Sequence, residues 1–184
     1  MMPDPLGLLT VLEDGDLRLE PLEERHRDGL RAACAEDEAI WDMYGVSYGA
    51  GHFDDSFTAL ICGVERLPFA ILVDGELAGM TAWIGTNAAW RSSEIGNTYL
   101  RPQFRGGRIN GPLKRLMLAH GFRCGLKRIF FSVDTRNARS QAACRKIGAS
   151  LDGVLRNERI TWTGFERDSA IFSVVERDRE RLGL

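Results

Sequence analysis

The stretch EIGNTYLRPQFRGGRINGPLKRLML, residues 94–118, decides the fold of this chain of 184 residues. It starts in a predicted strand, from about Ser93 to Leu100, and continues into two adjacent glycines that have Arg on both sides. From Ile109 to His120 the apolar residues fall on one face of a helix. Residues 94–118 therefore predict a strand, a glycine-rich loop and a helix in direct succession.

The glycine-rich loop has the chemistry of an anion-binding site. Gly106 and Gly107 permit a sharp turn that presents backbone N–H groups, and the dipole of the following helix adds to their attraction for an anion. Asn110 is a suitable N-cap and Pro112 is tolerated in a first turn, which predicts the helix start. No Gly-Lys-Ser/Thr follows, so a Walker loop is excluded, and G-x-G-x-x-G is absent. An ordinary connection with solvated arginines is the alternative.

Strand and helix patterns continue on both sides of this loop. The pair Asp74-Gly75 predicts the turn of an antiparallel hairpin, and residues 39–54 read as an irregular loop rich in aromatic side chains. The order predicts an α/β (α+β) fold with a mixed sheet. The predicted strands are 16–22, 69–73, 77–84, 93–100, 128–133 and two that flank residues 162–164, and the predicted helices are 23–36, 55–66, 109–120 and 137–147.

Composition and charge remove several classes of function. The chain has 24 Lys and Arg against 26 Asp and Glu, which is not the basic field of a nucleic-acid-binding protein. The dispersed cysteines and histidines give no metal-ligand spacing, and no G-x-S-x-G marks a hydrolase nucleophile. No apolar run approaches the roughly 20 residues of a membrane span, and the first residues lack the basic flank of a signal peptide. We expect a soluble cytoplasmic protein without metal, membrane or nucleic-acid partners.

Three separated motifs, in order, resemble the GNAT N-acetyltransferase superfamily. They are residues 94–118, FFSVDTRNARSQAACRKIGASLDGVLRNERI (130–160) and GFERDSAIFSVVERD (164–178), and they are most similar to the ribosomal-protein N-terminal, or Rim-type, branch. The resemblance implies a single domain over 1–184, with a core of about 17–176. It also implies a mixed, mostly antiparallel central sheet flanked by helices.

The resemblance implies an enzyme that moves an acetyl group from acetyl-coenzyme A to a primary amine. The amine would belong to a protein N-terminus or a small molecule, and transfer would be direct, in a ternary complex. A catalytically weak module that binds or senses acyl-coenzyme A is the alternative, and an esterase is disfavoured because no nucleophile is placed. The acceptor's identity is left open.

The family's coenzyme contacts match particular positions of this chain. Backbone N–H groups from Arg105 to Gly111 would hold the pyrophosphate, although Arg108 replaces the family's usual small residue. A bulged strand from Asn97 to Leu100 would present backbone to the thioester. The expected cofactor-binding residues are Tyr99, Leu100, Arg105, Gly106, Gly107, Arg108, Ile109, Asn110, Gly111, Asn137 and Ser140.

Glu94 and Ser140 are the expected catalytic residues. Glu94 matches the family glutamate that accepts the amine proton, with Asp42, Asp54 and Asp55 as weaker substitutes. Ser140 would protonate the leaving thiolate; its alternative is a plain first-turn residue behind an N-cap at Asn137.

Three further expectations concern packing. Trp41 and Tyr44 would shape the acceptor pocket, or else serve only in packing. Trp83, Phe130 and Phe131 are assigned to the core. The resemblance also implies a homodimer, because the family often pairs through its C-terminal strands, and the segment AIFSVV (170–175) is apolar enough to need cover.

Overall fold

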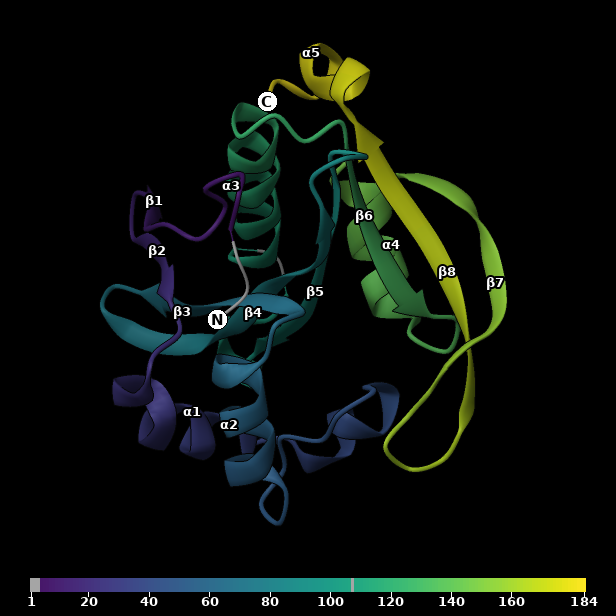
Figure 1. Ribbon diagram of the computed structural model, residues 1–184. Helices are drawn as coiled ribbons and strands as arrows, with labels where there is room; N and C mark the ends of the chain where they lie inside the picture. Colours follow the sequence, from purple (N-terminus) through teal and green to yellow (C-terminus); the bar gives the residue numbers. More distant parts are fainter. Residues whose placement is uncertain (1–3, 107) are drawn as a thin grey trace.

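The computed structural model describes residues 4–106 and 108–184, in which an open, mixed sheet is flanked by helices (Figure 1). Its strands follow the order β1-β2-β3-β4-β5-β6-β8-β7, and among the strands of the described residues only β5 and β6 pair in parallel. The strands are β1 (Leu12–Asp14), β2 (Leu17–Pro21), β3 (Arg66–Val73), β4 (Glu76–Asn87), β5 (Ser92–Leu100), β6 (Arg128–Asp134), β7 (Ser150–Ile160) and β8 (Glu166–Val175). The helices are α1 (Arg27–Cys34), α2 (Phe53–Cys62), α3 (Asn110–Arg123), α4 (Ala138–Lys146) and α5 (Arg179–Leu182), with 3₁₀ turns η1 (Glu24–His26), η2 (Glu38–Met43), η3 (Pro102–Phe104) and η4 (Glu176–Asp178). The mixed sheet and its flanking helices confirm the predicted fold class.

The two faces of the sheet are covered by different helices. Leu113, Met117 and Phe122 of α3 belong to the larger apolar cluster, together with Trp83 and Phe131 of the sheet. On the opposite face, α1, α2 and η2 pack in a second cluster built around aromatic side chains. Trp83 and Phe131 are thus core residues as predicted, whereas Phe130 is half-buried.

The local sequence predicted some of the turns and helix ends correctly and others incorrectly. Asp74 and Gly75 both have positive φ, 51° and 79°, and join β3 and β4 in the predicted antiparallel hairpin. Asn137 caps α4, since its Oδ1 accepts a hydrogen bond of 2.9 Å from the Ser140 backbone N–H. Asn110 is instead the first residue of α3, and Ile109 is the residue before it. The predicted cap at Asn110 is therefore wrong, because the helix starts one residue earlier than the capping pattern placed it.

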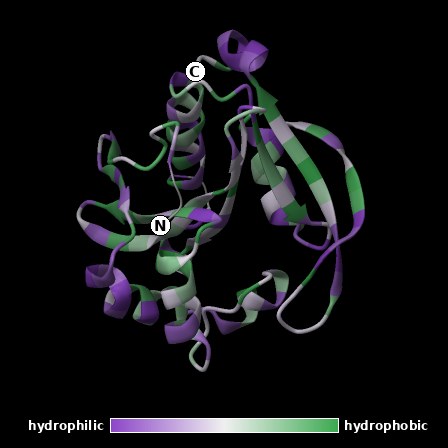
Figure 2. Cartoon of the chain, in the orientation of Figure 1, coloured by the Kyte–Doolittle hydropathy of each residue, from purple (hydrophilic) through white to green (hydrophobic). Residues whose placement is uncertain are grey.

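Residues 170–175 are not the uncovered surface that the homodimer prediction assumed. Residues 170–175 lie in β8, which pairs with β6 on one side and β7 on the other, so Phe172 and Val174 are fully buried within the chain. Figure 2 shows hydrophobic stretches along β8 and a hydrophilic α5. The exposed apolar side chains belong to the edge strand β7 instead, among them Leu151, Val154, Leu155 and Ile160.

Gly79 is required by the close approach of β4 and β5. A Cβ at this position would lie 2.0 Å from the Tyr99 carbonyl oxygen, which is backbone and has no room to rotate away. Gly79→Ala should lower the free energy of unfolding by about 2 kcal/mol or more, measured by urea denaturation. Gly51→Ala, where the added Cβ meets open space, is the control and should change it by less than about 0.5 kcal/mol. Equal losses in both variants would contradict this account.

Candidate active site

The two parallel strands at the centre of the sheet separate soon after they meet. β5 pairs with β6 only from Ser92 to Glu94, and beyond Glu94 neither strand continues this ladder (Figure 1). α3 follows the carboxyl end of β5 and α4 follows that of β6. Because parallel strands end at the same edge of a sheet, the N-termini of both helices lie at the opening between the strands, where an extended anionic ligand is favoured.

A bulge in β5 lines this opening. Met80 is opposite Tyr99 and Ala82 is opposite Gly96, so β5 has one residue more than β4 in this interval. Asn97 takes up the mismatch with a φ of 51°. The strand is therefore bulged where the family resemblance implied, and the backbone of Asn97 and Thr98 is out of register with β4.

Side chains from both faces of the sheet hold the bulge. The Tyr44 hydroxyl donates to the Thr98 carbonyl at 2.6 Å, and Asn97 Nδ2 donates to the Tyr48 hydroxyl at 3.2 Å. From the other face, Lys114 Nζ donates to Thr98 Oγ1 at 2.7 Å. Sequence reasoning missed Lys114; a charged residue directly after Leu113 on an otherwise apolar helix face was the available signal.

Trp41 supports this arrangement from the core. Its side chain has no exposed surface and stacks on Tyr99 with ring centroids 4.9 Å apart, while Tyr44 meets its edge at 5.0 Å. Burial raises the pKa of the Tyr44 hydroxyl above its usual range, so the group is a neutral hydrogen-bond donor. Of the two expected pocket residues, the structure gives Trp41 a packing position and Tyr44 a place beside the bulge.

The glycine-rich loop is anchored at its base and open at its tip. Arg105 Nε donates to the Leu100 carbonyl at 2.7 Å and its guanidinium also pairs with Asp37. Its own backbone N–H donates to Pro102. Arg105 thus secures the loop with its side chain rather than offering a free cation.

The tip of the loop leads into the start of α3. Gly106 has a φ of +94° with open space around it, and Gly107 lies outside the described residues. The N–H groups of Asn110 and Gly111 precede the first helical bond, from Leu113 to Ile109, so the helix itself does not use them. Arg108 is exposed and lies 3.4 Å from Asp16. These donors and this cation can face a phosphate from the solvent side.

Glu94 is the buried carboxylic acid at the start of the opening. Its side chain is 9% exposed, and burial raises its pKa, while the guanidinium of Arg159 at 3.8 Å acts in the opposite direction. Arg159 is held by Glu158 through hydrogen bonds of 2.6 and 2.7 Å. Sequence reasoning missed Arg159, whose side chain only the tertiary structure brings within 3.8 Å of Glu94.

The weaker substitutes for Glu94, which are Asp42, Asp54 and Asp55, are all exposed. Asp54 is exposed on α2 and accepts hydrogen bonds from Arg27 and Arg31, which lower its pKa. The exposed Asp42 contributes its backbone carbonyl to a contact with Arg136. Glu94 is the candidate base with the burial expected of a proton acceptor.

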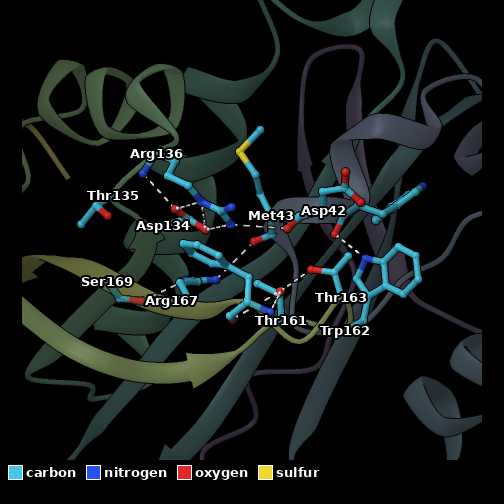
Figure 3. A network of polar contacts seen from close by, with 12 residues as sticks. Asp42, Met43, Asp134, Thr135, Arg136, Thr161, Trp162, Thr163, Arg167 and Ser169 are labelled. Atoms are coloured by element: carbon cyan, nitrogen blue, oxygen red, sulfur yellow. Dashed lines mark hydrogen bonds and ion pairs between the residues drawn. The ribbon is translucent and has the colours of Figure 1, made fainter.

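A network of polar contacts builds the wall on the other side of the site (Figure 3). The turn between β7 and β8 reaches η2, where Trp162 Nε1 donates to the Trp41 carbonyl at 2.9 Å. Buried Arg167 donates to the Ser132 carbonyl at 2.9 Å and reaches the Met43 carbonyl at 3.4 Å. Arg136 lies over the Phe165 ring and pairs with Asp134. Segments far apart in sequence thus form one wall, which no local pattern could have shown.

Two kinds of feature are absent from the described residues, 4–106 and 108–184. No group of three His, Cys, Asp or Glu side chains there is arranged to hold a metal ion. Within the same ranges, no helix has the length and hydropathy needed to span a membrane.

Comparison with known proteins identifies relatives of this fold. The family model described as an acetyltransferase (GNAT) domain matches residues 16–150, and no curated protein matches the chain. A GCN5-related N-acetyltransferase from Brucella melitensis is 26% identical, with a TM-score of 0.89 over 99% of this chain and 86% of that one. Mycobacterium smegmatis RimJ, solved with CoA-disulfide, is 22% identical, with a TM-score of 0.78 over 97% and 91%. A Salmonella typhimurium acetyl transferase that modifies the N-terminal serine of ribosomal protein L7/L12 is 18% identical, with a TM-score of 0.76 over 90% and 98%.

Proposed function

Since this chain belongs to the GNAT acetyltransferase family, we propose that it transfers the acetyl group of acetyl-coenzyme A directly to a primary amine in a ternary complex. The observation that carries this proposal is the buried carboxyl group of Glu94 at the opening between β5 and β6, on the same strand as the bulge. A candidate base and a backbone segment that is out of register with its neighbour thus lie on one strand, and acyl transfer would use both.

The residues at the opening suit acetyl-coenzyme A as the donor substrate. Its pyrophosphate is an anion that the backbone donors at the start of α3 would attract, with Arg108 adding positive charge. Open space at Gly106 and Gly111 lets a ligand approach the backbone closely. Asn137 would contact the pantetheine arm through its amide while its Oδ1 continues to cap α4.

The transfer needs one proton acceptor and one proton donor. Glu94 takes a proton from the acceptor ammonium, and the neutral amine attacks the thioester carbonyl carbon. The carbon–sulfur bond then breaks, and the thiolate takes a proton from the Ser140 hydroxyl. The attacking nitrogen loses its second proton as the amide forms, and this proton restores the Ser140 hydroxyl. Backbone of the bulge from Asn97 to Leu100 would stabilise the oxyanion between these steps.

The acceptor is an amine of a protein N-terminus or of a small molecule. Similarity in fold to the enzyme that acetylates L7/L12 supports a protein N-terminus as the first class to test. The second candidate function is a weak module that binds or senses acyl-coenzyme A. Release of coenzyme A together with an acetylated amine distinguishes the enzyme from the sensor.

The remaining proposals concern domain organisation, cellular location and oligomeric state. A single domain over 1–184, a cytoplasmic location and a homodimer are our proposals for this chain. Exposed Leu151, Val154 and Leu155 on β7 support the homodimer in place of the buried segment of β8. Light scattering at micromolar concentration should give twice the mass of the chain, and a monomeric mass would remove the homodimer.

Gly106 tests coenzyme binding by the loop. Gly106→Val places a β-branched residue at a φ of +94° and should change the loop backbone, because such a residue disfavours this conformation. Calorimetry should show coenzyme A binding weakened by about tenfold or more, the scale of losing one or two hydrogen bonds to a charged group. Gly75→Val, at a φ of +79° in the remote hairpin turn, controls for general strain and should bind coenzyme A normally. Equal affinities of both variants for coenzyme A would contradict binding of coenzyme A by the loop.

Glu94 tests the chemical step. Glu94→Gln should lower kcat by roughly 100-fold, the scale of losing a general base, with little change in coenzyme affinity. Because burial raises the pKa of Glu94, wild-type kcat should fall as the pH drops through a value above the ordinary carboxyl range. Thiol release with a saturating amine, followed against pH, measures both effects.

Substitution of Arg159 tests whether the acidic limb of the kcat–pH profile belongs to Glu94. Removing its charge in Arg159→Met should raise the pKa of Glu94 further and move the acidic limb of kcat to higher pH. Arg156→Met removes an exposed arginine of the same strand and should leave the limb in place. An acidic limb of kcat that stays in place in Arg159→Met, or a near-normal kcat in Glu94→Gln, would show that another group is the base.

A further inference from the structure

Lys114 is a buried lysine that the chemistry described above does not use. It lies on α3, is 8% exposed, and its Nζ is 5.4 Å from the centre of the Phe131 ring. A buried ammonium group costs stability because it loses its hydration. No carboxylate within 4.0 Å pairs with it in the part of the chain that the structure describes. Stability therefore does not explain why a lysine occupies this buried position.

The partner of Lys114 is the bulge of β5. Its Nζ donates to Thr98 Oγ1 at 2.7 Å, and the Thr98 hydroxyl is 2.8 Å from that of Thr81 on β4. The opposite side of the same residue is held by the Tyr44 hydroxyl, which donates to the Thr98 carbonyl. Lys114 is thus the charged member of a set of contacts that converge on one bulged residue.

We propose that Lys114 is a positioning residue for acetyl transfer, whose ammonium group holds the Thr98 hydroxyl and thereby the bulged backbone of Asn97 and Thr98. This inference rests on the proposed function, since the bulge is the segment that would face the thioester. A charge-assisted hydrogen bond is roughly twice as strong as a neutral one, so the protonated amine holds Thr98 more firmly than the neutral amine.

The protonation state of Lys114 should therefore appear in turnover. Burial lowers its pKa to about 8, while the charges of Cys144 on α4 and of Glu94 on β5 favour the charged form. Thr81 and Phe131, from β4 and β6, bring no charge to it. Turnover should fall as the pH rises through about 8, because the ammonium loses its proton.

Lys114→Met separates positioning from a structural role. If Lys114 positions the bulge, kcat should fall by about tenfold or more while the KM for acetyl-coenzyme A stays within about twofold. The melting temperature at neutral pH should rise, because a desolvated cation has been replaced by an apolar side chain of similar length. This gain should shrink above about pH 8, where wild-type Lys114 is neutral. A structural role predicts a lower melting temperature instead.

Lys127→Met is the matched control. Lys127 is an exposed lysine that pairs with Glu176, so the same substitution should leave kcat and its pH profile unchanged. Lys114→Arg keeps a cation at every accessible pH, and in a folded variant the loss of turnover above about pH 8 should disappear. An unchanged kcat in Lys114→Met, or a lower melting temperature together with lower kcat, overturns the inference.

A measurement on the wild-type protein does not depend on turnover. Backbone amide resonances of Asn97, Thr98 and Tyr99 should shift together with a midpoint near pH 8, and these shifts should vanish in Thr98→Val. Amides that do not titrate overturn the inference whether or not the protein is active. Titrating amides in a protein that acetylates no amine would contradict the proposed function, yet support the contact between Lys114 and Thr98.

Discussion

The separation of β5 from β6 after Glu94 is the constraint on which the rest of the site depends. Had the parallel ladder continued, its backbone hydrogen bonds would have closed the opening at which α3 and α4 begin. The bulge at Asn97 and Thr98 takes this backbone out of register with β4, which still pairs with the strand on either side of it. Gly79 allows the pairing to resume at Tyr99, because no side chain intervenes.

Some of the groups around this opening lower the stability of the fold, and others raise it. Lys114 and Glu94 are charged residues in a largely apolar setting, and burial moves the pKa of each toward its neutral form. Aromatic packing of Trp41 against Tyr44 and Tyr99 supports the same strand from the opposite face.

The wall formed by the network of polar contacts is assembled from segments that are remote in sequence. Contacts from Trp162 and Arg167 join the hairpin of β7 and β8 to the 3₁₀ turn η2, and Arg136 extends the same network to the end of β6 (Figure 3). These contacts use mainly backbone carbonyls as acceptors. The wall's shape therefore depends on the course of the backbone more than on individual side-chain pairs.

The sequence by itself determined the elements whose signals are local. The strand, glycine loop and helix of residues 94–118 and the turn at Asp74-Gly75 each depend on neighbours within a few residues, where backbone preference decides. Only the tertiary structure decided that Trp41 is buried, that β7 covers the apolar strand β8, and that Arg159 and Lys114 lie beside Glu94 and Thr98. Such contacts join distant segments, and their energies come from burial and charge that exist only once the chain is packed.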